Sequence, residues 1–382
     1  MDKAEPAFLC RVLRTHDQIA EVRERWIALQ AHPETDFDFF DTQLQLGHQP
    51  VVLAIYARSK CVALLAGLIQ KTRLEVGIGG CIFWRPKVRS LGLGPGSFMG
   101  AEDSGIMEFA VEQLLVFLKD ERLDLVVYHG LRWSSPIRRL LHSKPRFLCR
   151  DLLVRARNNW VMQLPQSLEE LFQTRMTKKR RYWAKRRIRF LERAYPNRIR
   201  YVSYSSNAKL ADLLRDISTI ARQSHLWGKR VGYQELPEQK NQIELFARKG
   251  LLRAVVLYIE EQPISYWVGF RYAQGLYLYY TGFVPKFRRD EPGTLALYQM
   301  IARACEEGVE YMYLRSGQYE YKQRLSTEHF EECNLLVFSG SLRGKLLNCV
   351  RTLLLGPLEL VRCTIEALGM GPAARRLLCR RD

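Results

Sequence analysis

The sequence contains no apolar run near the roughly 18 residues that a membrane-spanning helix needs. Its first residues lack the apolar core of a signal peptide, so we expect a cytoplasmic protein. The nine cysteines are scattered singly, without a Cys-x-x-Cys pair or the Cys/His spacing of a metal site. We therefore expect reduced thiols and no bound metal. Acidic residues are scarce as well, because 40 Asp and Glu stand against 59 Lys and Arg, for a net charge of +19.

The remaining composition fits a folded globular chain. Hydrophobic residues make up 47% of the sequence and charged residues 26%, close to the globular average, which excludes long disorder and coiled-coil rods. A length of 382 residues corresponds to two ordinary domains or one large one.

The excess positive charge is concentrated in two segments. Residues 175–198 contain eleven Lys or Arg and one acid, and residues 341–382 contain eight Lys or Arg and three acids. Most of the net charge therefore comes from these segments. Any polyanionic partner, whether phosphate, nucleic acid or anionic lipid, is expected to bind there.

Each basic segment has several interpretations. The charges of 175–198 form a solvated face, an anion site for donor or acceptor phosphates, or a surface for tRNA. The tail alternates cations with leucine clusters, and Gly356-Pro357 predicts a break between two short helices. The alternatives for the tail are peripheral contact with an anionic membrane at its inner face, packing on the core, and pairing of subunits.

The second half of the chain has the clearer pattern of elements. Apolar residues repeat every four or seven positions from 166 to 194, which predicts one long amphipathic helix with Trp183 on its buried stripe. Aromatic and β-branched runs predict antiparallel strands after it. The expected elements are strands at 251–260, 264–272 and 276–283, a helix at 293–308, and strands at 309–314 and 333–338.

The first half repeats this order less clearly. Its expected elements are a helix at 17–30, strands at 50–57, 61–71 and 74–84, a glycine loop at 92–97, a helix at 103–119 and a strand at 124–128. We therefore expect an α+β protein with domains at 1–158 and 159–340 and a basic amphipathic tail at 341–382.

The stretch from Leu276 to Lys322 combines residues that suit phosphate binding. A strand is followed by a loop with Arg288 and Arg289, and a helix then begins at Gly293-Thr294. A glycine at a helix N-terminus lets backbone N–H groups approach a phosphate, and the helix dipole favours its charge. Two neighbouring arginines add charge-assisted hydrogen bonds.

This order of elements resembles the core of the GNAT acyltransferases. The matching motifs are EEQPISY at 260–266, YTGFVP at 280–285, EPGT at 291–294 and YK at 321–322. Residues 160–340, with their arginine-rich helix, look like the GNAT domain of the CelD/BcsL-type acetyltransferases of cellulose biosynthesis. The tandem layout resembles the Fem-type aminoacyltransferases, which pair two GNAT-like domains.

The resemblance implies tandem GNAT-like domains, each with a mixed, largely antiparallel sheet flanked by helices. It also implies transfer of an acyl group from acetyl-CoA or acyl-CoA to an amine or hydroxyl of a small molecule, a sugar or another glycan, or a cell-envelope precursor. The N-terminal half is then a structural or acceptor-binding partner. The residues implied for the donor are Gly282, Phe283 and Val284 along the pantetheine, Arg288, Arg289, Gly293 and Thr294 at the pyrophosphate, and Tyr321 as the acid that protonates the thiolate.

The acceptor side offers less specific candidates. A general base is needed to deprotonate an amine, and His225 and Glu235 are the residues we consider for it. We assign Arg181, Trp227 and Lys322 to substrate binding. Three positions at which the family carries acids are Val284, Tyr313 and Gln318 here. These changes favour one alternative, a non-catalytic GNAT fold that binds a ligand, and the basic helix favours another, a Fem-type enzyme that uses aminoacyl-tRNA.

Overall fold

The computed structural model describes residues 8–78, 81–224, 227, 232–317 and 320–367. The chain forms two compact units that interleave along the sequence. The first unit consists of Met1–Gln30, Gly47–Ala156 and Glu332–Asp382, and the second of Ala31–Leu46 and Arg157–Glu331. A short piece of the N-terminal half therefore belongs to the second unit, and the residues after 331 return to the first.

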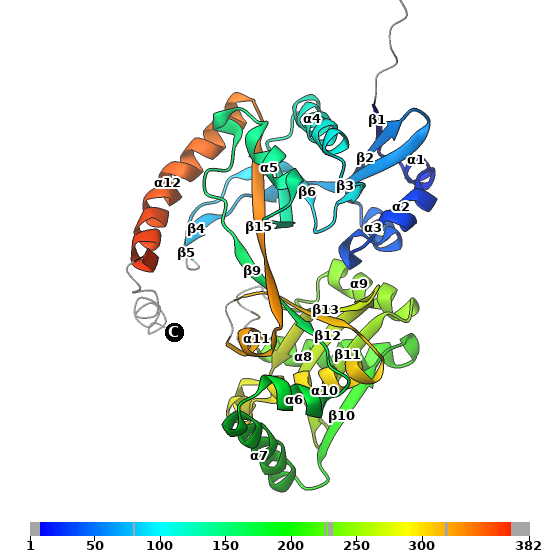
Figure 1. Ribbon diagram of the computed structural model, residues 1–382, viewed down its shortest axis with the longest axis vertical. Helices are drawn as coiled ribbons and strands as arrows, with labels where there is room; N and C mark the ends of the chain where they lie inside the picture. The colour runs from blue at the N-terminus through cyan, green and yellow to red at the C-terminus, as the bar shows by residue number, and fades with distance from the viewer. Residues whose placement is uncertain (1–7, 79–80, 225–226, 228–231, 318–319, 368–382) are drawn as a thin grey trace, which may run out of the picture. The chain divides into compact units, whose positions relative to one another are not determined.

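The helices and strands of the first unit are coloured from blue to green, with the last two in orange and red (Figure 1). In chain order they are β1 (Leu9–Leu13), α1 (His16–Ala20), α2 (Arg23–Leu29), β2 (Gln49–Ala57), β3 (Lys60–Arg73), β4 (Val76–Ile78), β5 (Cys81–Trp84), β6 (Lys87–Leu93), β7 (Phe98–Gly100), α4 (Ser104–Asp120), β8 (Leu125–Arg132), α5 (Pro136–Ser143), η2 (Phe147–Cys149), β15 (Glu328–Phe338) and α12 (Leu342–Ala367).

The second unit begins with a short insert from the N-terminal half. Its elements are η1 (Pro33–Thr35), α3 (Phe37–Gln45), β9 (Arg157–Gln163), α6 (Leu168–Arg175), α7 (Lys178–Ala194), β10 (Ile199–Tyr204), η3 (Asn207–Lys209), α8 (Leu210–Gln223), α9 (Pro237–Arg248), β11 (Leu252–Ile259), β12 (Gln262–Tyr272), β13 (Gly275–Phe283), η5 (Pro285–Asp290), α10 (Pro292–Glu306), β14 (Tyr311–Ser316) and α11 (Glu320–Leu325).

The two units share one strand order. The first unit runs β1-β2-β3-β6-β8-β15, and the second runs β10-β11-β12-β13-β14-β9. Neighbouring strands are antiparallel except β6 with β8 and β13 with β14, and a helix connects each parallel pair. A parallel pair needs such a crossover. The expected fold class, α+β with mixed, largely antiparallel sheets flanked by helices, is confirmed.

The sixth strand of each sheet comes from the other half of the chain. Strand β9 precedes the second half and pairs with β14, whereas residues 332–338 follow that half and pair with β8. The units therefore depart from a simple division into 1–158 and 159–340, since the chain crosses between them at both ends of the second half.

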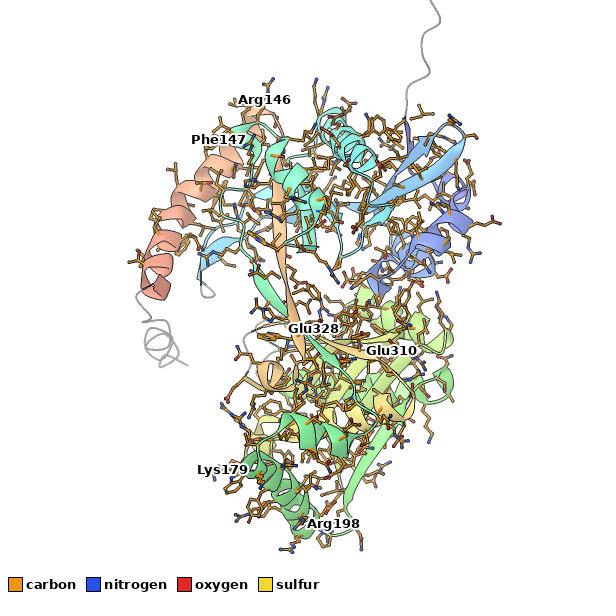
Figure 2. All side chains as sticks on the ribbon, in the orientation of Figure 1. Arg146, Phe147, Lys179, Arg198, Glu310 and Glu328 are labelled. Atoms are coloured by element: carbon orange, nitrogen blue, oxygen red, sulfur yellow. The ribbon has the colours of Figure 1, made fainter. Side chains whose placement is uncertain are left out.

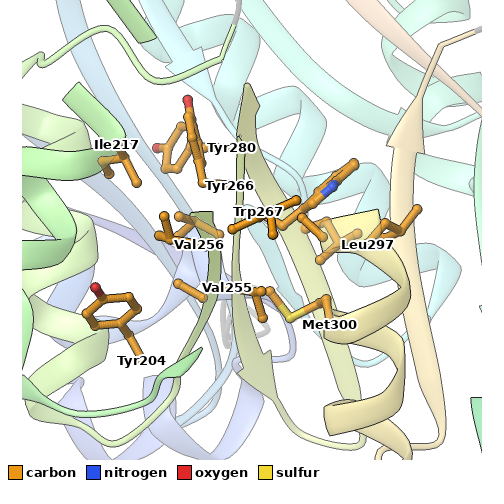
Figure 3. Close-up of a cluster of buried hydrophobic side chains, with 14 of the residues drawn as sticks. Tyr204, Ile217, Val255, Val256, Tyr266, Trp267, Tyr280, Leu297 and Met300 are labelled. Atoms are coloured by element: carbon orange, nitrogen blue, oxygen red, sulfur yellow. The ribbon is translucent and has the colours of Figure 1, made fainter. Parts of the chain in front are cut away.

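The core of the second unit lies on both faces of β11–β13. Side chains alternate between the two faces of a strand, so successive residues pack against different helices. Figure 3 shows Ile217, Tyr266 and Tyr280 on one side of these strands and Trp267, Leu297 and Met300 on the other. Helices α8 and α9 cover the first face, and α10 covers the second.

The helix expected over 166–194 is two helices. Helix α6 ends at Arg175, and Thr177 caps α7 by accepting a hydrogen bond from the Arg180 backbone N–H. The new start rotates the helical faces, so Leu191 is buried while Trp183 and Phe190 are exposed. The prediction that Trp183 lies in the core was therefore wrong, because threonine is a helix N-cap that the apolar periodicity ignores.

Three smaller differences have local causes. The helix expected at 17–30 is divided into α1 and α2, and the strand expected at 74–84 is the separate β4–β5 pair. The described part of the tail is one helix, α12, with Pro357 inside it rather than a break at Gly356-Pro357. A proline removes one backbone donor, and burial of Leu347 and Leu355 compensates for that loss.

The insert 31–46 is attached to the second unit by one buried carboxylate. Asp36 is 1% exposed and caps α3 at the Phe39 N–H. It also accepts hydrogen bonds from Lys249 Nζ at 2.7 Å and from the Tyr272 hydroxyl at 3.2 Å. Burial acts to lower the pKa of Lys249, but its bonds to Asp36 and Asp38 outweigh this effect and the pKa is raised. Because the pKa of Lys249 is raised, the lysine stays charged at neutral pH, and its contribution to stability is lost as the pH rises through that pKa.

We predict that Asp36→Ala lowers the free energy of unfolding of the second unit by about 2–4 kcal/mol, because it removes a helix cap and leaves a half-buried lysine without its main partner. The measurement is urea denaturation. Asp38→Ala is the matched control: Asp38 contacts the same lysine at 2.8 Å but is exposed. The control should cost less than about 1 kcal/mol. Equal effects of the two variants would show that Asp36 does not anchor the insert.

Candidate active site

The second unit contains a cavity of about 460 Å³ at the start of α10. Helices α6 and α7 form one wall, the first turns of α10 another, and α11 a third. The lining residues are Arg175, Met176, Arg180, Trp183, Ala184, Arg187, Glu291, Thr294, Leu295, Leu297, Tyr298, Tyr321, Arg324 and Leu325. A cavity of this size, with apolar walls and a few charged groups, is typical of a small-molecule site.

The charge of this cavity is positive. Four arginines line it against a single acid, Glu291. Arg187 forms an ion pair with Glu291, and Arg180 lies 3.8 Å from Glu320 of α11. Arg324 also lies 4.0 Å from Glu320. The four arginines still outnumber the two acids, Glu291 and Glu320, so the cavity favours an anionic ligand.

The start of α10 lies at this cavity because of an unusual turn. Glu291 adopts a left-handed conformation with φ of 48°, and its carbonyl accepts the Thr294 N–H at 2.9 Å. The Gly293 carbonyl accepts a hydrogen bond from Trp267 Nε1 at 2.8 Å. A Cβ at Gly293 would come no closer than 3.8 Å to any neighbour, so internal packing does not require glycine there. A glycine would be needed at position 293 if a ligand approached the backbone closely there.

Tyr321 reaches the same cavity from α11. Its ring lies edge-on to Trp267, with centroids 6.4 Å apart. Trp267 therefore contacts both the first turn of α10 and the tyrosine. Thr294 and Tyr321, which are 27 positions apart in the sequence, both line this cavity.

The parallel strands β13 and β14 separate next to this region. They pair only from Gly275 to Tyr277, opposite Tyr311 to Tyr313. Both strands then have a register irregularity, between Leu278 and Tyr280 in β13 and at Arg315 in β14, where φ is 61°. The separation opens the sheet at the carboxyl ends of its parallel strands, where α/β sheets commonly bind ligands.

The end of β13 is closely packed. A Cβ at Gly282 would lie 2.8 Å from the Tyr266 ring, so only glycine fits there. The Gly282 carbonyl accepts the Ser265 hydroxyl at 3.1 Å, and the Val284 N–H donates to the Ile264 carbonyl at 2.9 Å. The Gly282 carbonyl and the Val284 N–H are therefore already hydrogen-bonded to residues of β12.

A carboxylate from the insert lies at the strand separation. The Tyr279 hydroxyl donates to Glu34 Oε1 at 3.2 Å, and Arg315 Nη2 lies 3.9 Å from the same oxygen. The Arg315 guanidinium also covers the Tyr279 ring at 4.6 Å. Burial, assisted by Glu34, raises the pKa of Tyr279 well above its usual value, so its hydroxyl keeps the proton.

His32 fixes the position of Glu34. Its Nδ1 accepts the Glu34 backbone N–H at 3.1 Å, and its ring lies edge-on to Tyr277 at 5.0 Å. Burial lowers the pKa of His32 to about 4, so the ring is neutral at physiological pH and can accept this bond. Sequence reasoning did not consider Glu34, because no motif connects residue 34 with strands more than 240 positions away.

Several predicted site residues lie elsewhere. Lys322 is 6% exposed, and its Nζ donates to the carbonyls of Ser316 and Arg315. Arg288 and Arg289 are exposed on η5 and do not line the cavity, and from α7 it is Arg180 rather than Arg181 that does.

Glu235 and Trp227 do not line the cavity either. Burial acts to raise the pKa of Glu235, but hydrogen bonds from Ser218 and Arg222 outweigh it and the pKa is lowered, which disfavours a role as base. Trp227 is half-buried against the core. His225 lies outside the described residues.

Residues 178–323 match the family model of the acetyltransferase (GNAT) domain. The chain contains a GNAT domain. It is thus an enzyme of the GNAT type. The cavity lies beside helix α10, which follows strand β13. No curated protein matches the sequence. The comparisons do not single out the CelD/BcsL-type branch, which stays a prediction.

Solved structures support the tandem arrangement. A conserved protein of unknown function from Bacteroides thetaiotaomicron has 10% identity and a TM-score of 0.54, covering 86% of this chain and 100% of that one. FemX has 11% identity and a TM-score of 0.51, covering 84% and 96%. L-PGS from Bacillus licheniformis has 13% identity and a TM-score of 0.49, covering 88% and 96%. At such identities the first two show the fold alone, which is tandem GNAT-like.

None of the helices in the described part of the chain is both long and apolar enough to cross a bilayer. No group of three or more His, Cys, Asp or Glu side chains within the described ranges is arranged to hold a metal ion.

We predict that Arg187→Ala combined with Arg324→Ala weakens CoA binding by tenfold or more, since a charged hydrogen bond contributes about 1.5–3 kcal/mol. Isothermal titration calorimetry measures the change. Arg288→Ala combined with Arg289→Ala is the comparison, because these residues are exposed beside the same helix. We expect a smaller loss from it. The reverse order would assign the phosphates to η5 and not to the cavity.

Proposed function

We propose that this protein transfers an acyl group from acetyl-CoA or a longer acyl-CoA to an amine or hydroxyl of a small molecule, a sugar or a cell-envelope precursor. The observation that carries this proposal is the cationic cavity at the start of α10, next to the separation of β13 and β14. A CoA donor has phosphates for the arginines and a thioester arm long enough to reach the separated strands. The GNAT domain match supports the same class of donor.

The chemistry assigned to these residues is nucleophilic acyl substitution. Gly293, Thr294 and the cavity arginines hold the donor phosphates, with Arg288 and Arg289 as outer contacts. Glu34 accepts a proton from the acceptor, whose nitrogen or oxygen then forms a bond to the thioester carbon. The carbon–sulfur bond breaks, and the departing thiolate takes a proton from Tyr321.

A first prediction tests the acid. Tyr321→Phe should lower kcat by about 10²–10⁴-fold while CoA affinity changes little, because the ring still lines the cavity and only the proton is lost. Thiol release from acetyl-CoA gives kcat, and calorimetry gives affinity. Tyr298→Phe, which changes another hydroxyl in the same cavity, is the matched control. A wild-type kcat for Tyr321→Phe would show that this tyrosine packs in the cavity wall and does not donate the proton.

A second prediction tests the base. Glu34→Gln keeps a hydrogen-bond acceptor for Tyr279 but cannot take up a proton, so kcat/KM should fall by about 10²–10⁴-fold. Asp38→Asn, an exposed carboxylate on the same insert, is the control. A wild-type rate for Glu34→Gln would exclude proton transfer through Glu34.

A Fem-type donor, aminoacyl-tRNA, is the second candidate, favoured by the surface of α7. Tyr182, Trp183 and Phe190 are exposed among its lysines and arginines, and the Arg186 guanidinium lies 5.0 Å from the Trp183 ring centroid. Exposed aromatics within a cationic face suit stacking of single-stranded bases.

Calorimetry separates the two donors. Titration with acetyl-CoA, with longer acyl-CoAs and with charged tRNA identifies which donor binds, and thiol release distinguishes transfer from binding alone. Tight, strongly salt-dependent binding of charged tRNA without CoA binding would favour the Fem-type donor. Binding of CoA without turnover would favour a non-catalytic GNAT fold.

A further inference from the structure

Helix α12 has an inner face that belongs to the first unit. Leu347 and Leu355 are buried, and Asn348 Nδ2 donates to the carbonyls of Leu148 and Arg150 at 2.9 and 2.7 Å. Arg351 Nη1 lies 2.7 Å from Asp151, which is itself buried. These contacts fix the helix and its orientation, so removal of the tail would damage the core.

The opposite face of α12 exposes a line of leucines. Leu342, Leu346, Leu353 and Leu360 are 85%, 60%, 76% and 71% exposed. Their spacings of four, seven and seven residues place them on one stripe of the helix, because seven residues complete nearly two turns. An amphipathic helix of a protein in water normally presents polar residues on this face. The outer leucine stripe, defined by these four residues, therefore needs another explanation.

Neighbouring elements also expose apolar side chains. Helix α12 contacts η2 and β4. Phe147 and Leu148 on η2 are exposed, and so are Ile82 and Phe83 on β5, the partner of β4. Figure 2 shows Arg146 and Phe147 beside the first turns of α12. Exposed apolar side chains on three neighbouring elements are more than the narrow seam of a helix pair requires.

Cations accompany these apolar side chains. Arg343 follows Leu342, and its side chain is 63% exposed although it forms an ion pair with Asp124 at 2.9 Å. Lys345 lies between the first two leucines of the stripe. The sequence after α12 adds Arg375, Arg376, Arg380 and Arg381 against one acid, Asp382. A second copy of the chain would oppose this surface with the same charges and be repelled, whereas anionic headgroups complement it.

We propose that the outer leucine stripe and η2 dock on the surface of an anionic phospholipid bilayer, with α12 lying in the plane of the interface. Leucines enter the acyl boundary and the cations meet the headgroups, which is how interfacial amphipathic helices bind. This surface is independent of the acyl-transfer site, and it localises the enzyme to a membrane without a spanning helix.

Cosedimentation with vesicles tests this proposal. The full chain should sediment with vesicles of phosphatidylcholine and phosphatidylglycerol, bind weakly to phosphatidylcholine alone, and dissociate in high salt. Replacing the four stripe leucines by glutamine should reduce binding by about tenfold or more, because it removes the apolar contact while keeping helix propensity. Circular dichroism checks that the variant is folded, which the exposure of all four residues favours.

Two controls keep the outcome specific. The triple variant Leu9→Gln, Ile27→Gln, Val116→Gln removes exposed apolar residues of the same unit on other elements, and it should bind like the wild type. Lys179→Gln combined with Arg189→Gln, on exposed positions of α7, should also bind like the wild type.

Three results would overturn the proposal. They are absence of vesicle binding by the wild type, full binding by the leucine variant, and loss of binding in the α7 variant alone. A wild-type dimer in light scattering that the leucine variant converts to monomers, without vesicle binding, would show that a second copy covers the stripe.

Discussion

The buried carboxylate of Asp36 determines where the acceptor side of this enzyme can be built. Its bonds to Lys249 and Tyr272 attach a short insert from the N-terminal half to the second unit. The same insert carries Glu34 to Tyr279 and Arg315. The GNAT motifs of this chain lack acids at three expected positions. The insert instead supplies a carboxylate, Glu34, at the separation of β13 and β14. The interleaving of the two units has a chemical consequence, because neither half of the sequence contains the whole constellation.

The parallel strands β13 and β14 are the second constraint on the site. Three residue pairs hold them together, and beyond these pairs each strand changes its register with its other neighbour. Trp267 connects this region to the cavity through the Gly293 carbonyl and the Tyr321 ring. In the reaction that we propose, the donor phosphates lie at α10 and Glu34 acts at the separation of β13 and β14. The two sides of the proposed reaction are thus linked by one tryptophan and one strand separation.

Local patterns in the sequence were sufficient for the elements that form this framework. Alternating aromatic residues located β11–β13, and Gly293-Thr294 located the start of α10, because these signals depend only on neighbouring residues. The fate of Trp183 could not be read from periodicity, since the Thr177 cap changes which face of α7 is buried. Glu34 and the exchange of β9 and β15 depend on contacts between distant segments. A single sequence contains no record of such contacts.

The excess positive charge lies on two helices, α7 and α12, whose surroundings differ. On α7, Arg180 and Arg187 line a cavity that also contains Thr294 and Tyr321, so their charge is confined and suits a phosphate-bearing small molecule. On α12 the cations flank leucines that point away from the core, so their charge is spread over an open apolar surface and suits a bilayer. Composition alone treats the two segments alike. The surroundings of each cation therefore determine which anion it suits, and our two proposals rest on this difference between α7 and α12.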